Sequence, residues 1–182
     1  FPSTLPDSQS DLALQTMKDP YLFDFISLKG KVKELEIESA MINKIKDVLI
    51  ELGNGFAFVG NQYKLTVSNK DYFIDLLLYH LKLKCYIVVE LKAREFEPTV
   101  AGQLNFYLSA IDDLVKDESD NPSIGLLLCK TKDKFTVEYA LKDINKPIGV
   151  SEYKLLEDIP EYLQSQLPKA EDIELHIQDI EE

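Results

Sequence analysis

The fold follows from one short run, Tyr86-Ile87-Val88-Val89-Glu90-Leu91-Lys92, which is apolar until its last three positions. Side chains alternate between the two faces of a strand, so Glu90 and Lys92 share one face. The preceding residues 87–89 are apolar on both faces, which predicts a central strand. Charged side chains at the end of such a strand need a partner or a function, because burying an unpaired charge is costly.

The residues after this strand predict a helix and a second buried strand. Residues 100–115 have helical period, with Leu104, Leu108 and Ile111 on one face, and residues 123–129 are apolar again. A strand, a crossover helix and a second strand make the two strands parallel neighbours. We therefore expect a β-α-β unit within a sheet that helices cover.

The residues before the central strand predict one long helix and an antiparallel meander. Residues 32–52 have helical period, and Gly53 supplies a stop signal. Three apolar and aromatic runs follow, at residues 56–59, 63–67 and 72–79. Residues 68–71 separate the last two runs like a hairpin turn.

The remaining elements complete an α/β fold. Residues 132–143 predict a helix, with a strand as the alternative, residues 148–155 an edge strand, and residues 160–167 a short helix. The aromatic stretch at residues 21–25 is expected to dock on the core. The core order is αβββαβ, which predicts a central mixed β-sheet flanked by helices.

Length and composition indicate one folded domain. The chain has 182 residues, 45% of them hydrophobic, and no apolar run reaches the roughly 18 residues of a membrane helix. We expect a flexible arm or linker at residues 1–18, a folded domain at 19–168 and an acidic tail at 169–182. The chain lacks an initiator Met, which we interpret as a piece of a longer protein.

The net charge of −12 is concentrated at the ends of the chain. Nine acids and one lysine between residues 157 and 182 contribute −8, and residues 1–20 contribute −2. Residues 21–156 therefore carry only −2, so the charge does not exclude a nucleic-acid partner.

The cysteines and histidines exclude several kinds of site. Cys85 and Cys129 are too few for a disulfide framework or a four-thiolate zinc site, and we expect buried free thiols in a reducing cytosol. With His80 and His176 as the only histidines, a His-rich metal site is excluded and a Ser-His-Asp mechanism is disfavoured.

Asp75 poses the same question as Glu90, because it lies within the apolar run 72–79. An unpaired buried carboxylate is costly, so a cation should lie near Asp75. Two carboxylates and Lys92 on adjacent strands suit a hard divalent metal. The alternative is an ion pair of Lys92 with Glu90 or Asp75 that holds two strand ends together.

Three further residues extend this set. Glu38 projects from the first predicted helix, where Glu34 and Glu36 make a solvated acidic face the alternative. Gln103 and Tyr107 are four residues apart on the crossover helix and could lean over the end of the central strand. The alternative is that Tyr107 packs in the core and Gln103 is solvated.

The order Glu, Asp, Glu-x-Lys, Gln-x-x-x-Tyr resembles the PD-(D/E)XK nuclease superfamily, and more narrowly the catalytic C-terminal domain of YhcG-type bacterial proteins. Long blocks in order carry the resemblance: residues 19–25 (DPYLFDF), 51–60 (ELGNGFAFVG), 74–80 (IDLLLYH), 89–92 (VELK), 101–107 (AGQLNFY), 127–130 (LLCK) and 145–150 (NKPIGV). The resemblance covers about residues 19–168. One departure is Ile74, which stands where the superfamily has Pro.

The resemblance implies a restriction-endonuclease-like core with Mg²⁺-dependent deoxyribonuclease activity and Mn²⁺ as a substitute cation. Asp75, Glu90 and the Leu91 carbonyl would hold the metal. Lys92 would position or polarise the attacking water, and Glu38 would act through water or a second metal.

The resemblance also implies that Gln103 and Tyr107 support the site or contact the backbone phosphate. DNA is the expected partner, with RNA left open, together with an N-terminal domain of the same parent protein. A homo-oligomer is a further option, no membrane partner is expected, and we expect a cytoplasmic location. The alternative function is a catalytically silent nuclease-fold domain for DNA binding or protein assembly. Six basic residues are candidate phosphate contacts, and the alternative for each is a solvated surface side chain: Lys82, Lys84, Arg94, Lys130, Lys132 and Lys134.

Overall fold

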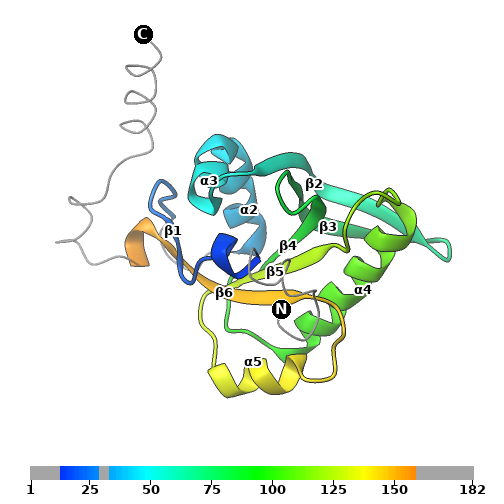
Figure 1. Ribbon diagram of the computed structural model, residues 1–182. Helices are drawn as coiled ribbons and strands as arrows, with labels where there is room; N and C mark the ends of the chain where they lie inside the picture. The colour runs from blue at the N-terminus through cyan, green and yellow to red at the C-terminus, as the bar shows by residue number, and fades with distance from the viewer. Residues whose placement is uncertain (1–12, 29–32, 159–182) are drawn as a thin grey trace, which may run out of the picture.

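A computed structural model describes residues 13–28 and 33–158 of the chain. Its centre is a six-stranded mixed sheet in the order β1-β6-β5-β4-β3-β2 (Figure 1). The strands are β1 (Tyr21–Phe23), β2 (Phe56–Val67), β3 (Lys70–His80), β4 (Cys85–Leu91), β5 (Ile124–Cys129) and β6 (Ile148–Leu155). A 3₁₀ turn, η1 (Leu156–Asp158), follows β6.

Helices cover both faces of this sheet (Figure 1). On one face α2 (Glu34–Asn43) and α3 (Ile45–Leu52) pack against alternate residues of β4, among them Ile87 and Val89. On the other face α4 (Pro98–Leu114) packs against Val88, and α5 (Lys134–Leu141) adds partly buried residues to the same cluster. The expected mixed sheet flanked by helices is confirmed.

The predicted β-α-β unit is confirmed as β4-α4-β5. Its two strands pair in parallel from Ile87↔Ile124 to Leu91↔Leu128, and they occupy the middle of the sheet. Residues 124–129 are all buried, as the apolar run predicted. The crossover helix packs directly on β5, and this contact fixes the helix over the sheet.

The β2–β3 hairpin reaches farther than its neighbour β4. Its turn is Ser68-Asn69, with φ of 50° and 66°, the left-handed pair that a two-residue hairpin turn requires. The β2–β3 pairing runs to Val67↔Lys70, whereas the β3–β4 pairing ends at Leu76↔Val89. The hairpin therefore projects beyond β4, and β3 and β4 part at its base.

Two predicted boundaries are wrong. The single helix expected at 32–52 is two helices that meet at Lys44, whose φ of −118° is not helical. Neither glycine nor proline marks this break, so hydrophobic periodicity runs through it. The two runs at 56–59 and 63–67 are one strand, because a β-bulge between Phe58 and Gly60 carries the pairing onward.

The strand at 148–155 is not at an edge as predicted, because β1 pairs with it in parallel and takes that place. Residues 13–18, expected in a flexible arm, contact the core: Ala13 is buried, and the Lys18 carbonyl accepts a hydrogen bond from Ser151 Oγ at 2.6 Å. The helix predicted at 160–167 and the acidic tail lie outside the described residues. Within the described part of the chain, no helix has the length and apolar character to cross a bilayer.

Candidate active site at the fork between β3 and β4

Side chains replace the backbone ladder where β3 and β4 separate. Beyond the last pair, Leu76↔Val89, the Asp75 N–H donates to Glu90 Oε1 at 3.3 Å. In return, the Leu91 N–H donates to Asp75 Oδ2 at 2.9 Å. Asp75 and Glu90 follow that pair in the antiparallel register, so their side chains share one face. The sequence prediction that these two residues meet on adjacent strands agrees with this placement.

Burial makes the two carboxyl groups difficult to ionise together. Glu90 is 3% exposed, and burial, followed by the charge of Asp75, raises its pKa to about 9. Burial also raises the pKa of Asp75, although the Leu91 N–H, a hydrogen bond with Glu90 and the positive charge of Lys92 oppose this shift. A cation bound at this fork, where β3 and β4 separate beside Asp75 and Glu90, would favour the ionised form of both carboxyl groups.

Glu38 joins the fork from α2 instead of facing solvent. It is 7% exposed, which rules out the solvated alternative for this residue. The Gln62 side-chain amide donates to Glu38 Oε1 at 2.9 Å and Oε2 at 2.7 Å, and also to Asp75 Oδ1 at 3.2 Å. Burial raises the pKa of Glu38, the Gln62 hydrogen bond lowers it, and the charge of Asp75 raises it further.

Gln62 is a residue that the sequence prediction missed. It lies between two apolar runs that we expected to be separate strands, and two residues beyond the block that ends at Gly60. A polar residue between two strands normally indicates a loop. Knowledge of the bulge, which makes β2 continuous, would have been needed to find it.

Lys92 lies at the fork but pairs with a different acid from those expected. Its Nζ is 3.7 Å from Glu34 Oε2 in the first turn of α2, and its side chain is 15% exposed. Its backbone is fixed on both sides, since its N–H donates to the Leu128 carbonyl at 2.8 Å and its carbonyl accepts from Tyr153 Oη at 3.0 Å. Glu34 is one helical turn before Glu38, so α2 presents both acids to the fork.

Gln103 and Tyr107 approach the fork from α4. Gln103 Nε2 donates to Tyr107 Oη at 3.2 Å, which confirms that they share a helix face. Tyr107 is 4% exposed, and its pKa is raised first by burial and then by the charges of Glu90 and Asp75. Tyr107 therefore packs in the core, as the alternative interpretation predicted. It is also close enough to Glu90 and Asp75 for their negative charges to affect its pKa.

Most of the predicted phosphate contacts are engaged elsewhere or distant. Three form ion pairs within the chain: Arg94 with Glu97 at 3.7 Å, Lys130 with Asp158 at 2.7 Å, and Lys132 with Asp19. Lys82 and Lys84 lie between β3 and β4, at the end of β4 opposite to Glu90. Lys134, at the start of α5, is exposed.

The donor chemistry at the fork fits Mg²⁺ better than a softer metal. Mg²⁺ is usually held by one or two carboxylates and keeps several waters, so Asp75, Glu90 and the Leu91 carbonyl would suffice. Across residues 13–28 and 33–158, no three His, Cys, Asp or Glu side chains form a ready metal cluster. Burial raises the thiol pKa of Cys85 to about 12 and of Cys129 to about 11, so neither is a thiolate nucleophile at neutral pH.

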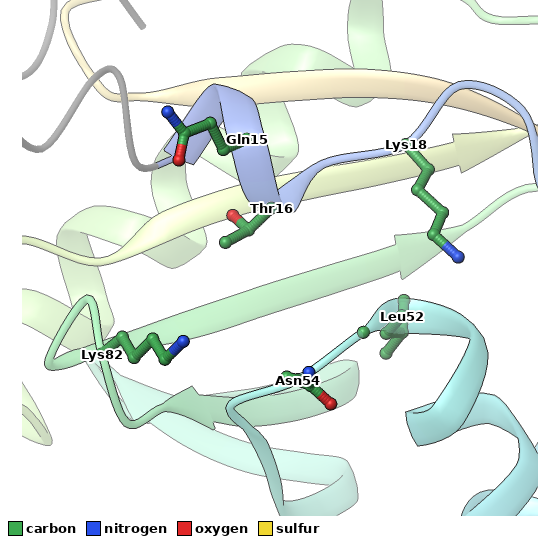
Figure 2. Close-up of a pocket in the computed structure, with 7 residues that line it drawn as sticks. Gln15, Thr16, Lys18, Leu52, Asn54 and Lys82 are labelled. Atoms are coloured by element: carbon green, nitrogen blue, oxygen red, sulfur yellow. The ribbon is translucent and has the colours of Figure 1, made fainter.

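A cavity of about 270 Å³, shown in Figure 2, is lined by none of the carboxylates of the fork. Its lining residues are Gln15, Thr16, Lys18, Leu52, Gly53, Asn54 and Lys82. Figure 2 shows Lys18 on the segment before β1 and Lys82 on the turn before β4, on opposite sides of the cavity. No carboxylate lines this cavity, so it offers no acidic ligand for a metal ion.

Comparison with known proteins places the chain in a family. The family model described as the YhcG PDDEXK nuclease domain matches residues 14–168. The protein YhcG of Escherichia coli (strain K12), which is named as a candidate nuclease, is 38% identical over 144 residues. That match covers 79% of this chain and 38% of the relative, so the chain spans well under half of the relative's length.

Two solved structures resemble the fold more distantly. The EndoMS–dsDNA2 complex is 17% identical with a TM-score of 0.47, over 76% of this chain and 50% of that one. A repair endonuclease from Pyrococcus abyssi is 15% identical with a TM-score of 0.47, over 73% and 50%. These likenesses are too weak to carry an argument, but the family match covers most of the chain. The chain therefore belongs to the YhcG PDDEXK nuclease domain family.

Proposed function

We propose that this domain is a metal-dependent nuclease that hydrolyses DNA phosphodiester bonds. The observation that carries the proposal is the fork itself, where Asp75 and Glu90 each accept a hydrogen bond from the other's strand and Lys92 comes directly after β4. Buried Glu90 and half-buried Asp75 both have raised pKa values beside a lysine, which is unusual in a purely structural strand end.

Asp75, Glu90 and the Leu91 carbonyl would hold Mg²⁺, or Mn²⁺ in its place. The bound cation would supply a lowered pKa for water and positive charge at the scissile phosphate. The Lys92 ammonium would orient the attacking water and stabilise the charge that develops on the phosphoryl oxygens. Glu34 holds Lys92 at the fork from the side of α2, at 3.7 Å.

The residues on the two flanking helices would complete the site. Glu38 would accept a proton or hold an outer water, because it faces the fork and is almost fully buried. Tyr107 and Gln103 would orient the substrate phosphate from α4, with the tyrosine hydroxyl fixed by the Gln103 amide. Both helices beside the fork, α2 and α4, would thereby contribute polar groups to the site.

The wider context is also proposed. The chain covers 38% of its relative, so we place it in a larger parent protein that carries an N-terminal domain. Cys85 and Cys129 are free and buried, which supports a reducing, cytoplasmic location. DNA is the proposed partner, and RNA is the alternative that the same assay tests.

Cleavage of supercoiled plasmid DNA and of a labelled RNA in Mg²⁺ tests the proposal. We expect cleavage of DNA by wild type, and loss of at least about a hundredfold in Asp75→Asn, because removing one charged group at such a site costs several kcal/mol. Asp71→Asn, an exposed acid on the same strand, is the matched control. Cleavage that survives Asp75→Asn would contradict the assignment, and metal binding without cleavage would favour a silent domain.

A further inference from the structure

We infer that Gln62 is a positioning residue that holds the Glu38 carboxylate beside Asp75. This inference rests on the proposed function, because it gives Gln62 a part in building the same site. One amide nitrogen lies within hydrogen-bond distance of both Glu38 oxygens, at 2.9 and 2.7 Å, and of Asp75 Oδ1, at 3.2 Å. No other contact described at the fork joins these two carboxylates.

The amide suits this place for a chemical reason. Two neighbouring carboxylates repel each other, so an acid at position 62 would force them apart. A lysine there would bring its own charge and compete with a metal ion for the same oxygens. A glutamine amide offers two N–H donors without charge, so it can hold the carboxylates together and leave the negative charge for a cation.

The backbone of Gln62 is shaped for this contact. Its φ is 45°, a left-handed conformation that costs a residue other than glycine about 1 kcal/mol or more. The β-bulge between Phe58 and Gly60 lies just before it in β2. An exposed strand residue thus reaches a buried side chain on α2, and its amide ties together α2, β2 and β3.

If Gln62 acts through Glu38, its loss should matter only while Glu38 is present. Gln62→Asn keeps an amide and suits a left-handed backbone, but its side chain is one methylene too short to reach Glu38. Gln62→Leu keeps the size and removes the donor. Asn61→Ala, which changes the exposed amide next to it on β2, is the control.

A double-mutant cycle with Glu38→Ala, read by calorimetric titration of Mn²⁺ into the full chain, tests the inference. Both Gln62 variants should weaken Mn²⁺ binding about tenfold, as one lost charge-assisted hydrogen bond would. In the Glu38→Ala background their effect should fall below about twofold. Melting temperatures check that the variants fold, and losing the bonds from Gln62 to α2 and β3 should lower them without unfolding the chain. If Gln62→Leu does not fold, Gln62→Asn gives the same comparison.

Two results would overturn the inference and leave the proposed function standing. One is Mn²⁺ binding by the Gln62 variants that equals wild type. The other is a loss that persists undiminished in the Glu38→Ala background. If wild type binds no Mn²⁺, either alone or with duplex DNA, the proposed function itself fails and the inference fails with it.

Discussion

The Asp75 and Glu90 side chains determine the chemistry of this domain because they occupy a gap in the sheet. Each carboxyl accepts a backbone N–H from the partner strand: Glu90 from Asp75 on β3, and Asp75 from Leu91 on β4. This exchange gives both N–H groups a partner, but it places a buried acid, Glu90, beside a half-buried one, Asp75. A bound cation would lower the free-energy cost of ionising both carboxyl groups.

The pKa of Glu90 predicts how stability depends on pH without metal. Its pKa is about 9 in the folded protein against an ordinary value of 4.5, so the folded state retains a proton that the unfolded chain releases. The protonated Glu90 side chain therefore makes its full contribution to the free energy of unfolding below about pH 4.5. That contribution is lost as the pH rises toward 9. Glu90→Gln mimics the protonated form, so in EDTA it should be more stable than wild type at high pH by about 1–3 kcal/mol.

Urea unfolding at low and high pH measures this difference. The gap between Glu90→Gln and wild type should close at low pH, where wild type is protonated too. Glu95→Gln, which changes an exposed acid after the same strand, should show no such pH-dependent gap. An equal gap at both pH values would show that the ionisation of Glu90 is not its cause.

Lys92 is expected to act in catalysis and not in holding the metal. Lys92→Ala should keep Mn²⁺ binding within about threefold of wild type and should lower the cleavage rate about 10²–10³-fold, since the charge on the phosphoryl oxygens loses its partner. The control is Lys142→Ala, an exposed lysine at the end of α5. Cleavage by Lys92→Ala at the wild-type rate would remove this lysine from the mechanism.

The sequence predicted these residues unevenly. Alternation along strands indicates which side chains share a face, so Asp75, Glu90 and Lys92 could be placed on neighbouring strands. It says nothing about contacts between elements that are distant in the chain. The pairing of Lys92 with Glu34 and the bridge from Gln62 both depend on where α2 sits over the sheet, so neither was predicted.

Among the elements, α4 carries two of the candidate site residues, Gln103 and Tyr107, and a glycine in β5 lies directly under this helix. A Cβ at Gly125 would lie 2.9 Å from Leu104 Cδ2 and 3.1 Å from Leu108 Cδ1. Gly125→Ala should therefore lower the free energy of unfolding by about 1–3 kcal/mol, because the buried Leu104 and Leu108 side chains, or α4 with them, must shift. Gly102 in α4 meets nothing within 4 Å, so Gly102→Ala should stabilise the protein by about 0.5–1 kcal/mol.

Chemical denaturation of both glycine variants separates packing from backbone effects. The changes in the free energy of unfolding should have opposite signs. Alanine is a better helix former than glycine at position 102, whereas at position 125 its side chain overpacks the core. If Gly125→Ala were neutral, the close approach of α4 to β5 would not control the position of the helix that bears Tyr107.

The element predictions succeeded where a pattern is local and failed where tertiary contacts decide. The β4-α4-β5 unit follows from apolar runs and crossover geometry alone. The break at Lys44 has no glycine or proline to mark it, and the interior place of β6 depends on β1, a strand of three residues. The position of so short a strand depends on pairing with β6 and cannot be predicted from the alternation of its own three residues.

Across the whole molecule, charge is expected to govern access to DNA. Residues 169–182 carry six acids and one lysine, and they would repel a polyanion. Deleting them in the Lys92→Ala background, where cleavage is expected to be slow, should strengthen binding to duplex DNA measured by fluorescence anisotropy. The gain should be larger at about 50 mM than at about 200 mM salt, because screening weakens repulsion. Equal affinities with and without these residues would argue against masking.

Titration of Mn²⁺ into wild type and Asp75→Asn by calorimetry addresses the metal site itself. It does not require the isolated domain to find its DNA target. We expect saturable binding by wild type and by Asp71→Asn, and none by Asp75→Asn, with duplex DNA added if the protein alone gives no signal. Equal binding by wild type and Asp75→Asn, or no binding by wild type with DNA present, would contradict a metal site at the fork.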